Sequence, residues 1–341
     1  MQDDTCYPTD LTDEQWALLE PLLPKRKRRG RIPKYALRNI VQAVLYLLRA
    51  GCAWRLLPKT FPPWSSVYGY FRRWVQSGLW QQIHEALRRS VRQQDGRETE
   101  PSAGVLDSQS VKLGDQGGVS GYDAGKNIKG RKRHVLVDTL GLLWGLVISG
   151  ADLQDRDGAV EVLCGLLGTA TLGRWELMWA DSAYGGQLEE WVRGLPTPQK
   201  LRLEIVRRCD DVKGFKVLPR RWVVERTFGW LVKCRRLVRD YEAKVAHSEA
   251  MLLIAMIALM LRRLAYQYIN EFLNTLLANC RAIPLPITPS VFTVLMSAST
   301  SASRRSPVVS SSIIGSRSYI MIPLRTHCHA QNQPSLMQYP R

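Results

Sequence analysis

The chain has 341 residues, of which 45% are hydrophobic, so it can bury a large core and divide into two globular domains with an extension. Its net charge of +18 and pI near 9.9 favour a polyanionic partner, although ribosomal, membrane-surface and heparin-binding proteins share this charge. The seven scattered cysteines contain no CxxC pair, which argues against a disulfide framework or a zinc site and favours a reduced cytoplasmic compartment.

The N-terminal segment predicts a small helical domain over residues 1–97. A basic run at 25–31 suits either a solvated loop or phosphate contacts, and Glu85 is the only acidic residue between Lys25 and Gln93. Apolar spacing and Pro or Gly boundaries predict helices over 10–24, over 33–50 ending at Gly51, over 64–74, and from Gly78 to about Gln93. The set resembles a helix-turn-helix module, with Arg72 and Arg73 available to DNA; the alternative is any small helical domain with a basic surface.

After a polar linker at 95–102, the pattern becomes α/β and predicts a second domain over 98–265. Helices are expected between and after the strands, over 155–167, 187–193 and 218–241. Residues 112–129 are Gly-rich and read as a mobile loop. We expect a mixed sheet with flanking helices, built from strands at 104–112, 134–138, 142–149, 175–180 and 203–207.

The expected helix over 218–241 carries one carboxylate, Glu225, in a strongly basic setting. Helical spacing places Glu225 on one stripe with Arg221, Gly229, Val232 and Arg236, and with Arg226 and Lys233 beside it. A surface helix with an i,i+4 Arg–Glu pair would explain this pattern. A metal-binding carboxylate beside a phosphate track would explain it equally well.

Two aspartates favour the second explanation. Asp107 is expected at the end of the first strand and Asp181 at the end of the fourth, where sites form in open α/β sheets. Three carboxylates at one point need a cation, and oxygen-only ligands select Mg²⁺ or Mn²⁺. Two such ions could clamp the attacking and leaving oxygens of a phosphodiester. Taken singly, each aspartate could equally be a turn or cap residue.

Four ordered motifs now make a family resemblance specific: LDSQSVK, KGRKRHVLVDTLG, ADSAYGG and RRWVVERTFGWLVKCRRL. In this order they resemble a bacterial insertion-sequence DDE transposase of the compact insertion-sequence-five type. The resemblance covers about Pro8 to Ala265 and implies a ribonuclease-H-like catalytic domain after the helical DNA-binding domain. It also implies that Asp107, Asp181 and Glu225 are the catalytic, metal-binding triad for two Mg²⁺ ions, with Mn²⁺ as a substitute.

The match around Glu225 is incomplete. Arg221 stands at its family position, but Leu218 replaces the family's Tyr, and Val232 stands where Lys is expected, with Lys233 next to it. A phosphate contact by Lys233 is therefore displaced by one residue, and Arg226 and Arg236 are expected to substitute.

Other charged residues have simpler expected roles. Asp138 reads as a hairpin residue, and Asp152 and Asp155 as helix caps, with an accessory site role as the alternative for Asp155. His134 is expected to pack or hydrogen-bond rather than act as a base. Either DNA-backbone contacts or a solvated strand end would explain the cations Lys129, Arg131, Lys132 and Arg133, and we favour the DNA contacts.

Two segments near the C-terminus complete the analysis. The longest apolar run, 250–261, is shorter than the ~20 residues that span a bilayer, so we expect a buried helix and no membrane partner. Residues 266–341 hold six Arg and one acid, Glu271, and are expected to form a disordered Ser- and Pro-rich tail, either dispensable or a basic arm for DNA.

The resemblance implies a transposase that binds terminal inverted repeats on double-stranded DNA, cleaves with a metal-dependent mechanism and joins the freed end to target DNA. It further implies a homodimer on paired ends, acting in the cytoplasm at the nucleoid. A ribonuclease-H-like nuclease without strand transfer and an inactive DNA-binding repressor are the alternatives.

Overall fold

The N-terminal region is helical, as predicted. A computed structural model describes residues 7–25, 33–167, 172–206 and 220–282; the expected basic loop falls almost wholly outside these ranges. Helix α1 (Asp13–Leu19) begins with a capping box, in which Thr12 accepts from the Gln15 backbone and Gln15 accepts from the Thr12 backbone. The 3₁₀ turn η1 (Glu20–Leu22) completes the expected first helix.

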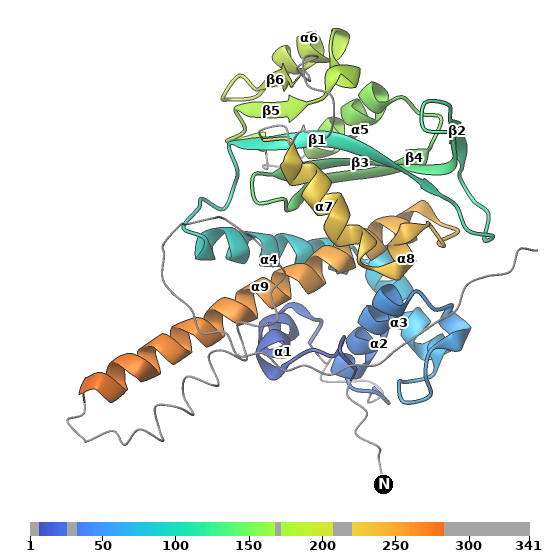
Figure 1. The fold of residues 1–341 in the computed structure, drawn as a ribbon. Helices are drawn as coiled ribbons and strands as arrows, with labels where there is room; N and C mark the ends of the chain where they lie inside the picture. The colour runs from blue at the N-terminus through green and yellow to red at the C-terminus, as the bar shows by residue number, and fades with distance from the viewer. Residues whose placement is uncertain (1–6, 26–32, 168–171, 207–219, 283–341) are drawn as a thin grey trace, which may run out of the picture. The chain divides into compact units, whose positions relative to one another are not determined.

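Three longer helices follow: α2 (Leu37–Ala50), α3 (Trp64–Gln76) and α4 (Leu79–Gln94), with a 3₁₀ turn η2 (Trp54–Leu56) between the first two (Figure 1). Helix α2 ends at Gly51, as predicted. This glycine has a φ of 76° and donates to the Leu47 carbonyl, the left-handed cap that glycine adopts without strain. Arg72 and Arg73 lie exposed on α3.

The second region is built on the predicted mixed sheet. Strands β3 (Ile128–Asp138) and β4 (Leu143–Gly150) run antiparallel to each other, and β3 runs antiparallel to β1 (Ala103–Lys112). Strands β5 (Leu177–Ala180) and β6 (Arg202–Ile205) extend the other side of β1 in parallel. With β2 (Gly121–Asp123), the order is β2-β3-β1-β5-β6, and β4 is also paired to β3.

Part of the segment that was expected to be a mobile loop is strand. Strand β2 (Gly121–Asp123) pairs with the start of β3, so Gly121 lies opposite Gly130 and Asp123 opposite Ile128. Close packing explains the glycines, because a Cβ at Gly130 would lie 2.0 Å from the Val111 carbonyl oxygen.

Alternate residues of the strands point to opposite faces of the sheet, and each face packs into a different hydrophobic core. Val105, Val135 and Val137 join a core with the N-terminal helices, α7 (Trp222–Val232) and α9 (Val245–Ala282). Leu106 and Leu136 point to the opposite core, with α5 (Asp155–Leu167) and α6 (Gln187–Arg193). The helical region and the sheet therefore share one compact unit within residues 1–278.

The prediction of one helix over 218–241 is wrong. Residues 218–219 lie outside the described ranges, α7 stops at Val232, and a separate short helix, α8 (Arg235–Val238), follows. Between them, Cys234 is extended, with φ of −88° and ψ of 109°, and is buried. The chain changes direction after Lys233, so the predicted helical stripe from Arg221 to Arg236 ends at Val232.

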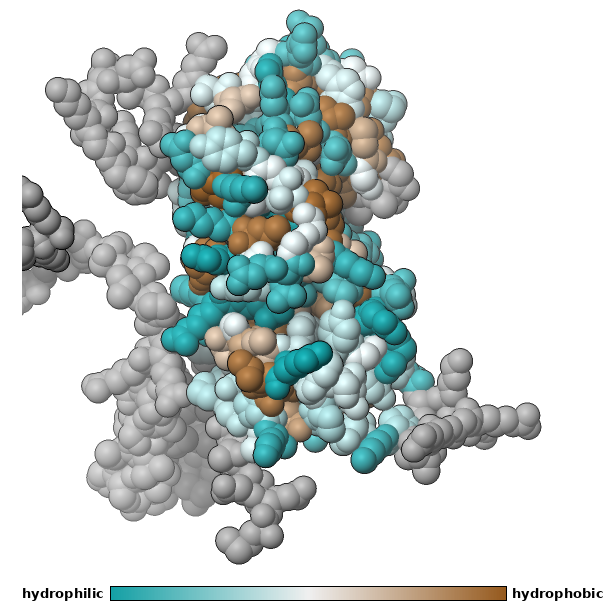
Figure 2. Space-filling view, turned by 90° about the vertical axis from the view of Figure 1, so that its right-hand side faces the viewer, coloured by the Kyte–Doolittle hydropathy of each residue, from teal (hydrophilic) through white to brown (hydrophobic). Residues whose placement is uncertain are grey.

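Helix α9 contains the apolar run 250–261, whose residues are largely buried as expected. Its segment Val245–Tyr266 is long and apolar enough to cross a membrane by length and composition, yet 61% of that window is buried inside the protein. The boundary expected at 265 falls inside α9, and residues 283–341 lie outside the described ranges. Figure 2 shows hydrophilic residues over much of one face, with smaller hydrophobic groups between them.

Candidate active site

Asp107 and Asp181 are brought together by the register of two parallel strands. Asp107 lies within β1 rather than at its end, because β1 continues to Lys112. Val105 pairs with Trp179, and the same offset extended by two residues sets Asp181 beside Asp107. Asp181 directly follows β5 and caps the 3₁₀ turn η4 (Ser182–Tyr184) by accepting from the Ala183 backbone at 2.9 Å.

Glu225 reaches the same place from α7. Arg221, the residue before this helix, holds its Nη2 atom 3.4 Å from Asp107 Oδ2, 3.7 Å from Asp181 Oδ2 and 3.9 Å from Glu225 Oε1. No two of these oxygens can be farther apart than twice the longest of the three distances. The structure therefore gathers the three predicted acids, which come from segments far apart in the sequence, around one guanidinium group.

The three carboxylates differ in their surroundings. Asp107 lies deepest, and burial raises its pKa to about 6. A hydrogen bond from the Ser108 backbone and the Arg221 charge oppose this rise in pKa, while Asp181 and Glu225 add to it. The Asp181 and Glu225 side chains are 34% and 53% exposed, so the cluster opens to solvent on their side.

A second layer of polar contacts supports Asp107. Ser108 donates its backbone N–H to Asp107 at 2.7 Å and its hydroxyl to Asp155 Oδ1 at 2.8 Å. Lys132 Nζ lies 2.9 Å from the same Asp155 oxygen. Asp155 is the first residue of α5, near where a helix cap was expected, and it also contacts the neighbour of Asp107.

Sequence reasoning missed Tyr184, which belongs to the ADSAYGG motif but was given no role. Its ring is fully buried, and its pKa is raised well above the usual value, first by burial and then by the charges of Asp107 and Asp155. The buried phenol therefore stays protonated. The available signal was its position three residues after Asp181 in a quoted motif.

The donor set suits a hard divalent cation, because all three side chains offer carboxylate oxygens. In the described ranges, no three His, Cys, Asp or Glu side chains lie close enough to hold a metal ion as they stand. At the meeting point of the three acids lies the positively charged Arg221, which is 8% exposed. The cluster thus attracts a cation, and Arg221 would have to withdraw before the acids could share a metal ion.

Three of the four basic residues expected to contact DNA before the second strand lie inside the protein. Arg131 pairs with Asp240 at 3.1 Å and donates to the Glu242 carbonyl. Arg133 is 1% exposed and donates to Gln109. Lys132 pairs with Asp155, as described above. The DNA-contact prediction is therefore wrong for Arg131, Lys132 and Arg133, which lie inside the protein, whereas Lys129 is exposed.

The stripe on the Glu225 helix also changes. Arg236 is buried, pairs with Glu242 at 2.7 Å and donates to the Cys52 carbonyl. The prediction that Arg236 takes the place of the family's Lys in contacting a phosphate is therefore wrong. Lys233 is exposed at the end of α7. Arg226 is half-buried and donates to the Leu140 carbonyl at 3.0 Å.

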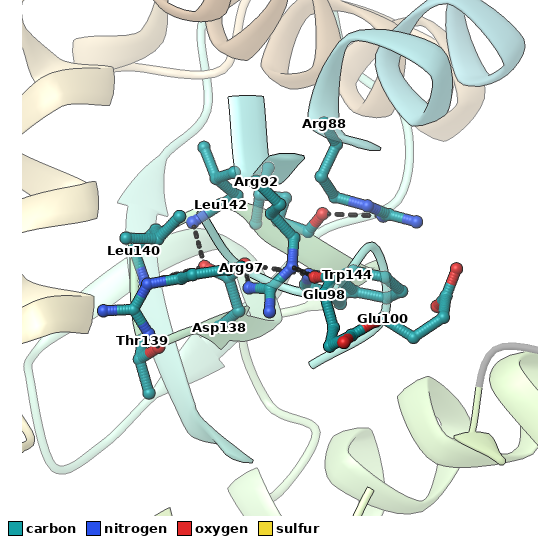
Figure 3. Close-up of polar contacts among 12 residues, drawn as sticks. Arg88, Arg92, Arg97, Glu98, Glu100, Asp138, Thr139, Leu140, Leu142 and Trp144 are labelled. Carbon is teal, nitrogen blue, oxygen red and sulfur yellow. Dashed lines mark hydrogen bonds and ion pairs between the residues drawn. The ribbon is translucent and has the colours of Figure 1, made fainter. Parts of the chain in front are cut away.

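The turn that follows β3 joins the sheet to the helical region (Figure 3). Asp138 is a hairpin residue, as predicted: it accepts from the backbones of Leu140 and Leu142, and its carboxylate pairs with Arg92 of α4. Nearby, Arg88 donates to the Leu143 carbonyl at 2.9 Å. Two buried arginines of α4 therefore anchor this turn.

Comparison with known proteins agrees with this arrangement. Residues 98–261 match a family model described as a transposase DDE domain, and residues 11–84 match one for transposases of the IS4/5 family. An uncharacterized 16.2 kDa protein of insertion element IS402, from Burkholderia cepacia, is 34% identical over 109 residues, which is 30% of this chain and 72% of that protein. The chain belongs to the DDE transposases of the IS4/5 family.

A second relative of this transposase is the uncharacterized protein y4sN of Sinorhizobium fredii, 28% identical over 81 residues, which is 24% of this chain and 65% of that protein. No solved structure matches the chain. The predicted family and fold class are confirmed: the transposase has a ribonuclease-H-like DDE domain after a helical region. Membership implies an enzyme that acts on DNA and depends on a divalent metal.

Proposed function

We propose that this transposase binds the terminal inverted repeats of an insertion sequence, cleaves the DNA there and transfers the freed strand to a target site. Three acids from distant segments lie within 4 Å of one guanidinium nitrogen, and this single observation carries the proposal. Such convergence needs a compensating cation, and it matches the metal-binding acids that the family requires.

Asp107, Asp181 and Glu225 would hold the metal, which we propose to be two Mg²⁺ ions replaceable by Mn²⁺. When bound, the ions supply Lewis-acid activation of the attacking oxygen and stabilise charge on the phosphate. Arg221 would exchange its carboxylate partners for the scissile phosphate, since its planar guanidinium binds either anion. Buried Asp107 keeps its position through the Ser108 backbone hydrogen bond.

DNA binding would use exposed cations outside the buried networks. Four of the expected DNA-binding cations are exposed and could contact phosphates. They are Arg72 and Arg73 on α3, Lys129 near the start of β3, and Lys233 after α7. Arg226 would contribute beside the site. We propose that two copies work together on paired ends, in the cytoplasm at the nucleoid.

The decisive experiment uses DNA that carries the inverted repeats flanking the gene. The wild-type protein with Mg²⁺ should cut at the repeat ends and join them to target DNA. Asp107→Asn should lower cleavage at least ~10³-fold and leave end binding nearly unchanged, because it removes a metal ligand and no DNA contact.

Asp157→Asn is the matched control, since Asp157 is an exposed aspartate in the first turn of α5. It should cleave like the wild type. Cleavage retained by Asp107→Asn would refute the site. Wild-type cutting without joining would instead identify a nuclease, and binding alone a repressor.

A further inference from the structure

The end of helix α2 and the chain that follows α7 hold each other through two arginines. Arg49, near the end of α2, donates from Nη1 to the Lys233 carbonyl at 2.6 Å. In the opposite direction, Arg236 on α8 donates from Nη1 to the Cys52 carbonyl at 2.7 Å. Each arginine therefore binds a main-chain oxygen of the other segment. We call this contact between residues 49–52 and 233–236 the α2–α8 joint.

The backbones at the α2–α8 joint also lie close together. Gly51 ends α2 with a φ of 76°, and a Cβ at this position would lie 2.9 Å from the Arg235 Cβ. A contact this short excludes a side chain, so glycine allows α2 to approach α8 as closely as it does. Arg236 is buried and pairs with Glu242 at 2.7 Å, which holds its guanidinium in place. The two segments are therefore packed against each other as well as hydrogen-bonded.

Helix α7 is attached to its surroundings at two places along its length. Arg226 and Thr227 donate to carbonyls in the turn after β3, as described above. Lys233 is attached to α2 through Arg49, about 9 Å further along the helix axis than Thr227. One attachment alone would let the helix swing about it, whereas two attachments fix its direction.

The direction of α7 decides where its first residues lie. Arg221 directly precedes the helix and Glu225 lies in its first turn, and both belong to the carboxylate cluster. Arg221 lies about 9 Å from Thr227 along the axis, on the side away from Lys233, so a swing of about 10° would move it by about 1.5 Å. A misplacement of about 1 Å can cost an enzyme about 10²-fold in rate. A small change in the direction of α7 would therefore impair the site.

We propose that Arg49 is a positioning residue for DNA cleavage, and this proposal rests on the function proposed above. Arg49 holds the end of α7 so that Arg221 and Glu225 keep their places at the carboxylate cluster. The last carbonyls of a helix lack partners within the helix and carry partial negative charge, so a guanidinium suits this position. A residue of the helical region thus acts on the reaction through the catalytic helix, without contacting the reacting phosphate.

The test measures cleavage of DNA that carries the inverted repeats, at saturating DNA and Mg²⁺, by the full-length protein. Arg49→Met removes the charge and the hydrogen-bond donors but keeps an unbranched side chain. It should lower kcat roughly tenfold and leave KM for the DNA nearly unchanged, because the loss is in the position of α7. Arg49→Lys, which keeps the charge and a donor, should restore most of the rate. Circular dichroism checks that both variants are folded, as expected for an exposed residue.

Arg38→Met is the matched control. Arg38 also lies on α2 and donates to a main-chain oxygen, the Leu11 carbonyl, at 2.7 Å, but this contact stays within the helical region. The variant should cleave with the wild-type kcat. The proposal is overturned if Arg49→Met also has the wild-type kcat, or if the two variants lose the same share of it.

A second measurement needs neither DNA nor metal. Hydrogen exchange followed by mass spectrometry should show faster exchange over 222–232 in Arg49→Met than in the wild type or in Arg38→Met, because α7 has lost one attachment. Unchanged exchange over this range overturns the proposal. If the wild type does not cleave DNA, the function proposed above fails, whereas faster exchange in Arg49→Met still supports the positioning of α7 by Arg49.

Discussion

Arg92 and Asp138 form an ion pair in the interior, with their side chains 4% and 0% exposed. This pair joins α4, in the helical region, to the turn after β3. The same turn contacts the catalytic helix, because Arg226 donates to the Leu140 carbonyl and Thr227 to the Gly141 carbonyl. One buried turn therefore fixes both the helical region and the helix that carries Glu225.

We expect Asp138→Asn to lower the free energy of unfolding by about 3–5 kcal/mol, because it leaves the buried Arg92 guanidinium without a counter-charge. Urea unfolding followed by tryptophan fluorescence measures this. The exposed pair Arg38–Asp13 gives the control, where Asp13→Asn should cost less than about 1 kcal/mol. Equal losses from the two variants would mean that the buried pair contributes no more than the exposed one.

The sheet was largely predictable because local patterns specify it. Val105 and Leu106 are adjacent apolar residues that point to opposite faces, as expected for a strand buried on both sides. Gly51 marks the end of α2, because glycine adopts the left-handed conformation without strain. The break at Cys234 was not predictable in this way. No Pro or Gly marks it, and it depends on burial of Cys234 and on pairing of Arg236 with Glu242.

The meeting of the three acids was predictable from motif order. The strand register explains the interval between the two aspartates, because β1 and β5 pair with the same offset that separates Asp107 from Asp181. The fate of the β3 cations was not predictable. Arg131 reads as a surface charge until the chain returns more than a hundred residues later with Asp240 and the Glu242 carbonyl. Only the tertiary fold shows that Arg131, Lys132 and Arg133 lie inside the protein.

Arg221 should compete with metal for the three carboxylates. We expect Arg221→Gln to bind Mn²⁺ roughly tenfold more tightly than the wild type, because the acids then repel one another without a guanidinium between them. DNA cleavage should nevertheless fall, since the phosphate loses its guanidinium partner. Isothermal titration with Mn²⁺ measures the affinity, and Arg235→Gln, an exposed arginine on α8, is the control. Weaker Mn²⁺ binding by Arg221→Gln would contradict the competition.

Exposed arginines of α3 should set the salt dependence of DNA binding. Arg72→Gln and Arg73→Gln should each reduce the slope of log affinity against log salt by about 1, because each would remove one phosphate contact. Fluorescence anisotropy over a salt series gives these slopes. Arg89→Gln on α4 is the comparison, as Arg89 already lies 3.5 Å from Glu100 and should change the slope little. Slopes equal to the wild-type slope for Arg72→Gln and Arg73→Gln would rule out α3 as the DNA-contacting helix.

His84 should make the protein less stable in acid. It is 1% exposed on α4, and burial, together with the nearby Arg88 charge, lowers its pKa to about 3. The unfolded chain takes up this proton near pH 6.5 and the folded chain only near pH 3. The stabilisation is therefore complete above about pH 6.5, and each pH unit below that removes about 1.4 kcal/mol from the free energy of unfolding.

Urea unfolding of His84→Leu between about pH 6 and pH 4 tests this. The variant should lose the part of the slope of unfolding free energy against pH that His84 causes. It should keep the part due to His134, whose pKa burial lowers to about 4. If wild type and variant lose stability in parallel as the pH falls, His84 is not neutral in the folded protein.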